Sequence, residues 1–71
     1  GMTFQLYQIV VYDNPVGFNP KAQCPWDEMQ GKLGVVVNPQ LSSEGTIMVQ
    51  FHEEDWPRFV YETSLRLYVH K

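Results

Sequence analysis

The sequence predicts an all-β domain of five short antiparallel strands, and three observations carry this prediction. Apolar and polar residues alternate in several short windows, which is the pattern of half-buried strands. Proline and glycine interrupt the chain so often that no segment of ten or more residues keeps a helical period free of both. Aromatic residues make up 14% of the chain, so rings must supply much of the core.

The length of the chain allows one domain. Domains usually contain about 50–200 residues, and a chain of 71 residues cannot hold a second independent core. Gly1 in front of Met2 is typical of the remnant left by tag removal, so we expect a single domain over residues 2–71.

The first two strands are expected on either side of a long loop. Tyr7–Tyr12 alternates, and Lys32–Val37 is rich in β-branched residues, although its three consecutive valines leave open which face points inward. Asp13–Gln30 between them holds three prolines, each of which biases the preceding residue away from helix. A loop of this length is usually functional or mobile.

The remaining three strands follow with short connections. Thr46–His52 alternates clearly, and the charged segment Glu53–Pro57 predicts a hairpin turn into a strand over Arg58–Glu62. At Thr63–Ser64 we expect a short turn, one turn of 3₁₀-helix, that redirects the chain. Leu65–Val69 alternates again and predicts the last strand.

Five short strands in this order, with a long first loop and a short turn before the last strand, outline a small SH3-like barrel. Closure of the barrel would remove the sheet edges that so small a β domain cannot otherwise protect. The alternating positions predict a main core of Ile9, Val11, Val36, Ile47, Val49, Phe51, Phe59 and Leu67.

Catalysis, metal binding and cofactor binding are not expected. A metal site needs three or four ligands held together, whereas the chain has the single cysteine Cys24 and two distant histidines, His52 and His70. We expect both histidines to be solvated surface residues, and the carboxylates of Asp27–Glu28 and Glu53–Asp55 to be solubilising charge. No segment has the strand and helix context of a phosphate-binding loop. The chain is therefore expected not to be an enzyme.

Charge and hydropathy bound the possible partners. The net charge of −3 argues against the basic face of a nucleic-acid-binding protein. An SH3-like module associated with nucleic acid stays the alternative, and it would require Lys32, Arg58 and Arg66 to gather on one face. The longest apolar run, Ile9–Tyr12, is far shorter than the ~20 residues of a membrane span. The lone cysteine fits a cytoplasmic location.

The chain has more aromatic residues than one small barrel can hide completely, and the surplus predicts a surface for another protein. In the long loop, the apolar side chains either cover an open end of the barrel or complete a surface with a partner. At the hairpin, the carboxylates are expected to steer a basic partner. The predicted partner-binding residues are Phe18, Trp26, Met29, Glu53, Glu54, Asp55 and Trp56.

The order of several segments resembles the variable (alpha) chain of ferredoxin:thioredoxin reductase. The segments are Val10–Pro15, Trp26–Val36, Met48–Phe51, Arg58–Phe59 and Leu65–Leu67. The resemblance implies an SH3-like barrel that acts as the non-catalytic partner of an iron–sulfur redox subunit in ferredoxin-linked metabolism. It also implies a cyanobacterial cytoplasm or a plastid stroma. In that family the cluster and the redox cysteines lie on the other subunit, which agrees with the lone Cys24.

Overall fold

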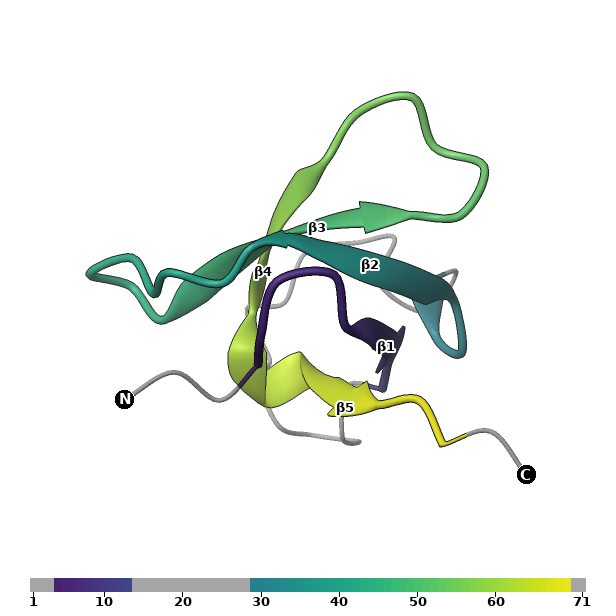
Figure 1. The fold of residues 1–71 in the computed structure, drawn as a ribbon, viewed down its shortest axis with the longest axis horizontal. Helices are drawn as coiled ribbons and strands as arrows, with labels where there is room; N and C mark the ends of the chain where they lie inside the picture. Colours follow the sequence, from purple (N-terminus) through teal and green to yellow (C-terminus); the bar gives the residue numbers. More distant parts are fainter. Residues whose placement is uncertain (1–3, 14–28, 70–71) are drawn as a thin grey trace.

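The computed structural model describes residues 4–13 and 29–69 (Figure 1). The expected all-β class and its five strands are confirmed, each strand lying within or one residue beyond its predicted range. The elements are β1 (Ile9–Tyr12), β2 (Leu33–Asn38), β3 (Thr46–Phe51), β4 (Arg58–Tyr61), the 3₁₀-helix η1 (Glu62–Ser64) and β5 (Leu65–Leu67).

The five strands form one antiparallel sheet in the order β4-β3-β2-β1-β5. Strands β1, β2 and β3 each pair with the next strand in sequence, and β5 returns to pair with β1. The helix η1 is the predicted single turn before the last strand, and it turns the chain from β4 toward β5 (Figure 1). Within the described residues β4 and β5 are not paired with each other, so hydrogen bonds do not close the barrel as expected.

The core lies on the inner face of the bent sheet. Among the predicted core residues, Val36, Ile47, Val49 and Phe51 are at most 2% exposed and belong to the central cluster. Val11 is also buried, but it lies outside that cluster. The other members of the cluster are Phe4, Val10, Tyr12, Met29, Val60 and Leu65.

Three of the predicted core residues are exposed instead: Ile9 at 51%, Phe59 at 64% and Leu67 at 46%. Strand pairing explains the first two, because strands β1 and β4 carry apolar side chains on both faces and alternation cannot choose between them. Ile9 lies across from Val35, and Phe59 across from Met48, on the outer face. Leu67 is the last residue of the three-residue strand β5, of which only the first residue, Leu65, is buried.

Gly34 allows β2 and β3 to approach closely. It pairs with Phe51, and a Cβ atom at Gly34 would lie 2.6 Å from Val49 Cγ1 and 2.9 Å from Phe51 Cδ1. Both neighbours are fixed in the core. The ring of Tyr12 packs edge-on against Phe51, with centroids 6.2 Å apart and an angle of 69° between the planes.

A buried polar contact joins η1 to β1. Burial raises the pKa of the Tyr12 hydroxyl, and a hydrogen bond with the side chain of Ser64 partly opposes that shift. The Asp13 N–H also donates to the Ser64 carbonyl oxygen at 2.8 Å. These bonds hold the turn against β1, and β5 begins at the next residue.

We predict that Gly34→Ala lowers the free energy of unfolding by about 1–3 kcal/mol, because the added methyl overpacks the core. Urea unfolding followed by circular dichroism measures the change. The double variant Gly34→Ala/Val49→Ala, in which the second substitution removes the closest contact, should lose less stability than the sum of the two single variants. Strict additivity would contradict the proposed clash.

Candidate functional site

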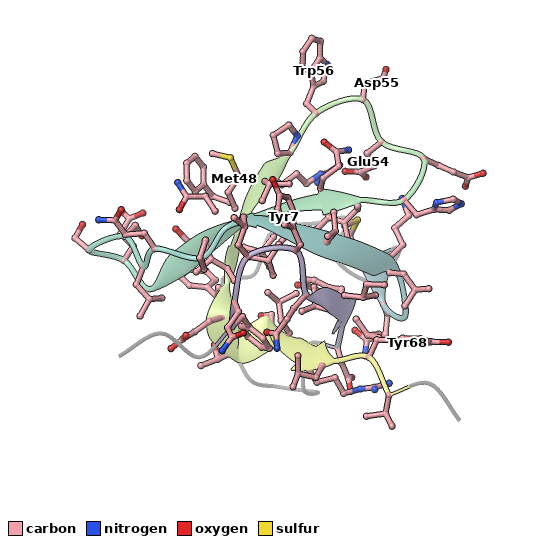
Figure 2. The ribbon with its side chains drawn as sticks, in the orientation of Figure 1. Tyr7, Met48, Glu54, Asp55, Trp56 and Tyr68 are labelled. Carbon is pink, nitrogen blue, oxygen red and sulfur yellow. The ribbon has the colours of Figure 1, made fainter. Side chains whose placement is uncertain are left out.

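The loop between β3 and β4 carries the most exposed large hydrophobic side chain of the described residues. Trp56 is 77% exposed and lies at the far end of this loop, away from the sheet (Figure 2). The reversal begins at Glu53, whose φ of +68° is in the left-handed region, and the Glu54 N–H donates to the Phe51 carbonyl oxygen at 3.2 Å. We call residues Glu53–Trp56 the hairpin tip.

Glu54 holds the base of the hairpin tip through two cations. The Arg58 guanidinium binds the Glu54 carboxylate in a bidentate manner. Its Nε donates to Oε1 at 2.7 Å, and its Nη2 donates to Oε2 at 3.1 Å. Lys32, which precedes β2, places its Nζ 3.3 Å from Oε2. Only 14% of the Glu54 side chain is exposed, so these ion pairs are less screened by solvent than pairs on the open surface.

Gln50 adds a second support from β3. Its Nε2 donates to the Glu54 carbonyl oxygen at 2.6 Å and to the Phe51 carbonyl oxygen at 3.2 Å. The hairpin is therefore held in two ways. Its backbone is bound to Gln50 of β3, and the Glu54 side chain is bound to Lys32 beside β2 and to Arg58 of β4. A surface held in this way loses little conformational freedom on binding.

The charge state of Glu54 follows from the same contacts. Burial alone would raise the pKa of this carboxyl, but hydrogen bonds from Arg58 and Lys32, together with their charges, outweigh burial and lower it. Glu54 therefore stays ionised at neutral pH and keeps both cations in place.

The structure separates the predicted site residues into three groups. Glu53, Asp55 and Trp56 are exposed at the hairpin tip, whereas Glu54 is the brace beneath them. Met29 is 3% exposed and packs in the core. For this residue the structure agrees with the alternative in which the loop side chain covers the domain and does not face a partner. Phe18 and Trp26 lie outside the described residues.

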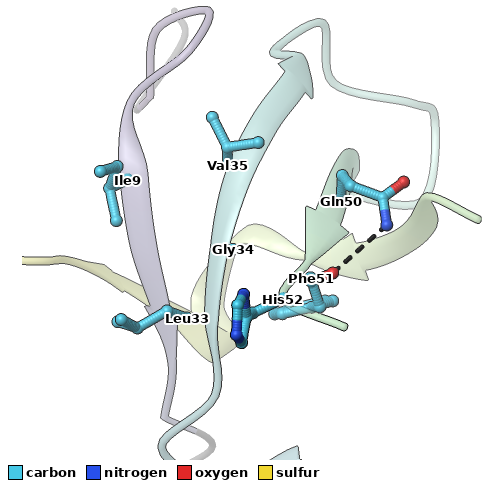
Figure 3. A pocket seen from close by; sticks show the side chains of 7 residues that line it. All are labelled: Ile9, Leu33, Gly34, Val35, Gln50, Phe51 and His52. Atoms are coloured by element: carbon cyan, nitrogen blue, oxygen red, sulfur yellow. Dashed lines mark hydrogen bonds between the residues drawn. The ribbon is translucent and has the colours of Figure 1, made fainter. Parts of the chain in front are cut away.

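Sequence reasoning missed a second feature, an open apolar hollow of about 390 Å³ on the outer face of β1, β2 and β3 (Figure 3). The apolar residues on both faces of β1 and β2 were the available signal, because a sheet with a single covered face leaves the other set exposed. We call this feature the outer hollow. It is lined by Ile9, Leu33, Gly34, Val35, Gln50, Phe51 and His52.

The cations that a nucleic-acid surface would need are already paired. Lys32 and Arg58 do come together, but both bind the carboxylate of Glu54. Arg66 places its Nε 2.9 Å from Asp13 Oδ2. The three described cations named by the alternative therefore each face a carboxylate of the same chain.

The described residues contain neither a metal-binding cluster nor a membrane-spanning helix. Residues 4–13 and 29–69 hold no group of three histidine, cysteine, aspartate or glutamate side chains placed to bind a metal ion. In the same ranges, no helix has the length and apolar character needed to cross a membrane. His52 is exposed as predicted, and Cys24 and His70 lie outside the described residues.

No family model matches the chain, and neither a curated protein nor a solved structure matches it. Its function is therefore inferred from the chemistry of its surface, above all from the hairpin tip and the outer hollow.

We predict that Glu54→Gln lowers the free energy of unfolding at neutral pH by about 1–2 kcal/mol, because it removes the charge that holds Arg58 and Lys32. The lowered pKa of Glu54 sets the sign of the pH dependence. The stabilisation is present above the pKa of the unfolded carboxyl and is lost as pH falls through the lower pKa of the folded one, so the stabilities of wild type and variant should converge as the solution is acidified.

Urea unfolding at several pH values measures this difference. The matched control is Glu53→Gln, which changes an exposed carboxylate without an ion pair to any described residue and should stay within about 0.5 kcal/mol of wild type. Equal stability of the two variants at neutral pH would show that Glu54 does not brace the hairpin.

Proposed function

We propose that this chain is a non-catalytic protein-binding module whose partner docks on the hairpin tip. The observation that carries the proposal is Trp56, which is 77% exposed on a hairpin braced by Glu54. Tryptophan is enriched among the few interface residues that supply most of the binding energy, and an exposed one on a held loop is suited to that role.

The brace supports this reading because it adds nothing to the burial of Trp56 itself. The ion pairs of Glu54 and the hydrogen bonds of Gln50 order a loop whose aromatic side chain stays in solvent. Ordering a loop costs backbone entropy of about 1–2 kcal/mol per residue. Because the loop is already in one conformation, this entropy is not lost again when a partner binds, and binding is stronger.

The resemblance to the variable chain of ferredoxin:thioredoxin reductase supports one class of partner, an iron–sulfur redox subunit. Two residues from the resembling segments, Tyr12 and Phe51, pack on each other in the core. The packing of these two side chains belongs to the core, and neither side chain is part of the exposed surface of the hairpin tip. The docking role and the class of partner are therefore separate parts of the proposal and are tested separately.

The alternative, an SH3-like module associated with nucleic acid, has less support. Nucleic-acid binding draws on cations that are free to contact phosphates. Lys32 and Arg58 share Glu54, Arg66 faces Asp13, and the net charge of the chain is −3.

We predict that Trp56→Ala leaves the free energy of unfolding within about 1 kcal/mol of wild type but reduces recovery of the partner by about tenfold or more. The immobilised chain is exposed to extract from its source organism, and the retained protein is quantified by mass spectrometry. Val69→Ser, which changes another exposed apolar residue, is the control and should retain the partner.

Two results would contradict different parts of the proposal. Undiminished recovery by Trp56→Ala would show that the hairpin tip is not the docking site. A retained partner without iron and acid-labile sulfide would contradict the iron–sulfur class and leave the docking role in place.

A further inference from the structure

We propose that the outer hollow receives an apolar side chain of an extended basic peptide segment, whose lysine or arginine residues lie over the hairpin tip. This inference rests on the proposed function, because it uses the same tip. It goes further by adding a second contact region and by naming the chemistry of the segment that docks.

The outer hollow is built from a row of residues across three strands. Ile9 on β1 lies opposite Val35 on β2, and Val35 lies opposite Gln50 on β3. Leu33 and His52 lie at its other end (Figure 3). Ile9 is 51% exposed and Leu33 is 39% exposed, so apolar side chains meet solvent here. A concave apolar surface with a few polar groups at its border is typical of a binding site.

The outer hollow and the hairpin tip follow one another along the chain. Gln50, Phe51 and His52 line the hollow, and Glu53 begins the tip at the next residue. Gln50 also donates from Nε2 to the Glu54 carbonyl oxygen, so one side chain both borders the hollow and holds the tip. A partner segment that fills the hollow is therefore adjacent to the carboxylates of the tip.

The charges at the tip select a basic segment. Lys32 and Arg58 are occupied by Glu54, whereas Glu53 and Asp55 are exposed and have no ion pair with any residue of the described ranges. These two carboxylates line an open recess together with Glu54, Trp56 and Arg58, so three carboxylates face one guanidinium there and the net charge of the recess is negative. An exposed indole ring attracts lysine and arginine side chains through its π face, and carboxylates add to that attraction. An acidic segment would be repelled.

A second copy of the chain is a poorer occupant than a basic segment. It would bring another net charge of −3 and another acidic tip toward the same surface. A peptide segment in extended conformation avoids this repulsion, and it can follow the surface from the strands to the tip.

The test uses short synthetic glycine–serine peptides that contain one leucine and two arginines, with the spacing between them varied. Binding is followed on the whole chain by ¹⁵N-resolved NMR titration at low salt. We expect at least one spacing to shift the amide signals of Ile9, Leu33 and His52 together with those of Glu53 and Trp56. Replacing the leucine by serine, or the arginines by glutamates, should weaken binding about tenfold.

The matched protein variants are Ile9→Ser and Leu6→Ser. Both residues are exposed to a similar degree, 51% and 47%, but only Ile9 lines the outer hollow. Ile9→Ser should weaken binding of the best peptide about fivefold or more, and Leu6→Ser should leave it within about twofold. Trp56→Ala should also weaken it.

Three results would overturn the inference. The first is that no peptide of the set shifts the signals of the hollow at millimolar concentration. The second is equal binding by Ile9→Ser and Leu6→Ser. If Trp56→Ala still abolishes binding in that case, the outer hollow is not part of the binding site, and the docking role of the hairpin tip stands. The third is a dimer in sedimentation analysis that Ile9→Ser dissociates, which would make a second copy the occupant.

Discussion

The packing around Phe51 is the constraint on which the rest of this small structure depends. One five-stranded sheet must bury its own inner face, so the side chains on that face have to pack against one another. Phe51 is 1% exposed, with the ring of Tyr12 from β1 against it and Gly34 of β2 opposite. Because Gly34 has no side chain, β2 and β3 come close enough to enclose the ring.

The hairpin tip depends on the same residue. The Phe51 carbonyl oxygen accepts hydrogen bonds from the Glu54 N–H and from Gln50 Nε2, so the last core residue of β3 is also the anchor of the loop. Glu54 then joins this anchor to Lys32 and Arg58. Packing in the core and presentation of Trp56 are thus parts of one connected arrangement, which explains how so short a chain holds an aromatic residue away from its body (Figure 2).

The surface left by this arrangement is uneven in its chemistry. The inner face of the sheet is filled, while the outer face keeps apolar side chains in contact with solvent at the outer hollow. Lys32 and Arg58 together carry one more charge than Glu54 balances, and the exposed carboxylates of Glu53 and Asp55 make the hairpin region negative in total. The proposed recognition of another polypeptide depends on this combination of an apolar hollow with an aromatic and acidic loop.

Much of the fold could be predicted from local pattern. Period-two alternation located four of the strands, β-branched content located β2, and the order of the segments placed the 3₁₀ turn before β5. These features depend on residues close together in the sequence, where strand geometry acts directly. The turn that forms the hairpin tip was predicted for the same reason, since a short charged segment before a proline favours a turn.

Only the tertiary structure decided the contacts between residues far apart in the sequence. Ile9 and Phe59 lie on the outer face because strand pairing orients β1 and β4, and their apolar residues on both faces could not show which side is buried. Glu54 was predicted to steer a partner, but Lys32, 22 positions away, and Arg58 make it a brace. The outer hollow likewise exists only where three strands lie side by side, because its lining is assembled across strands and not along any one of them.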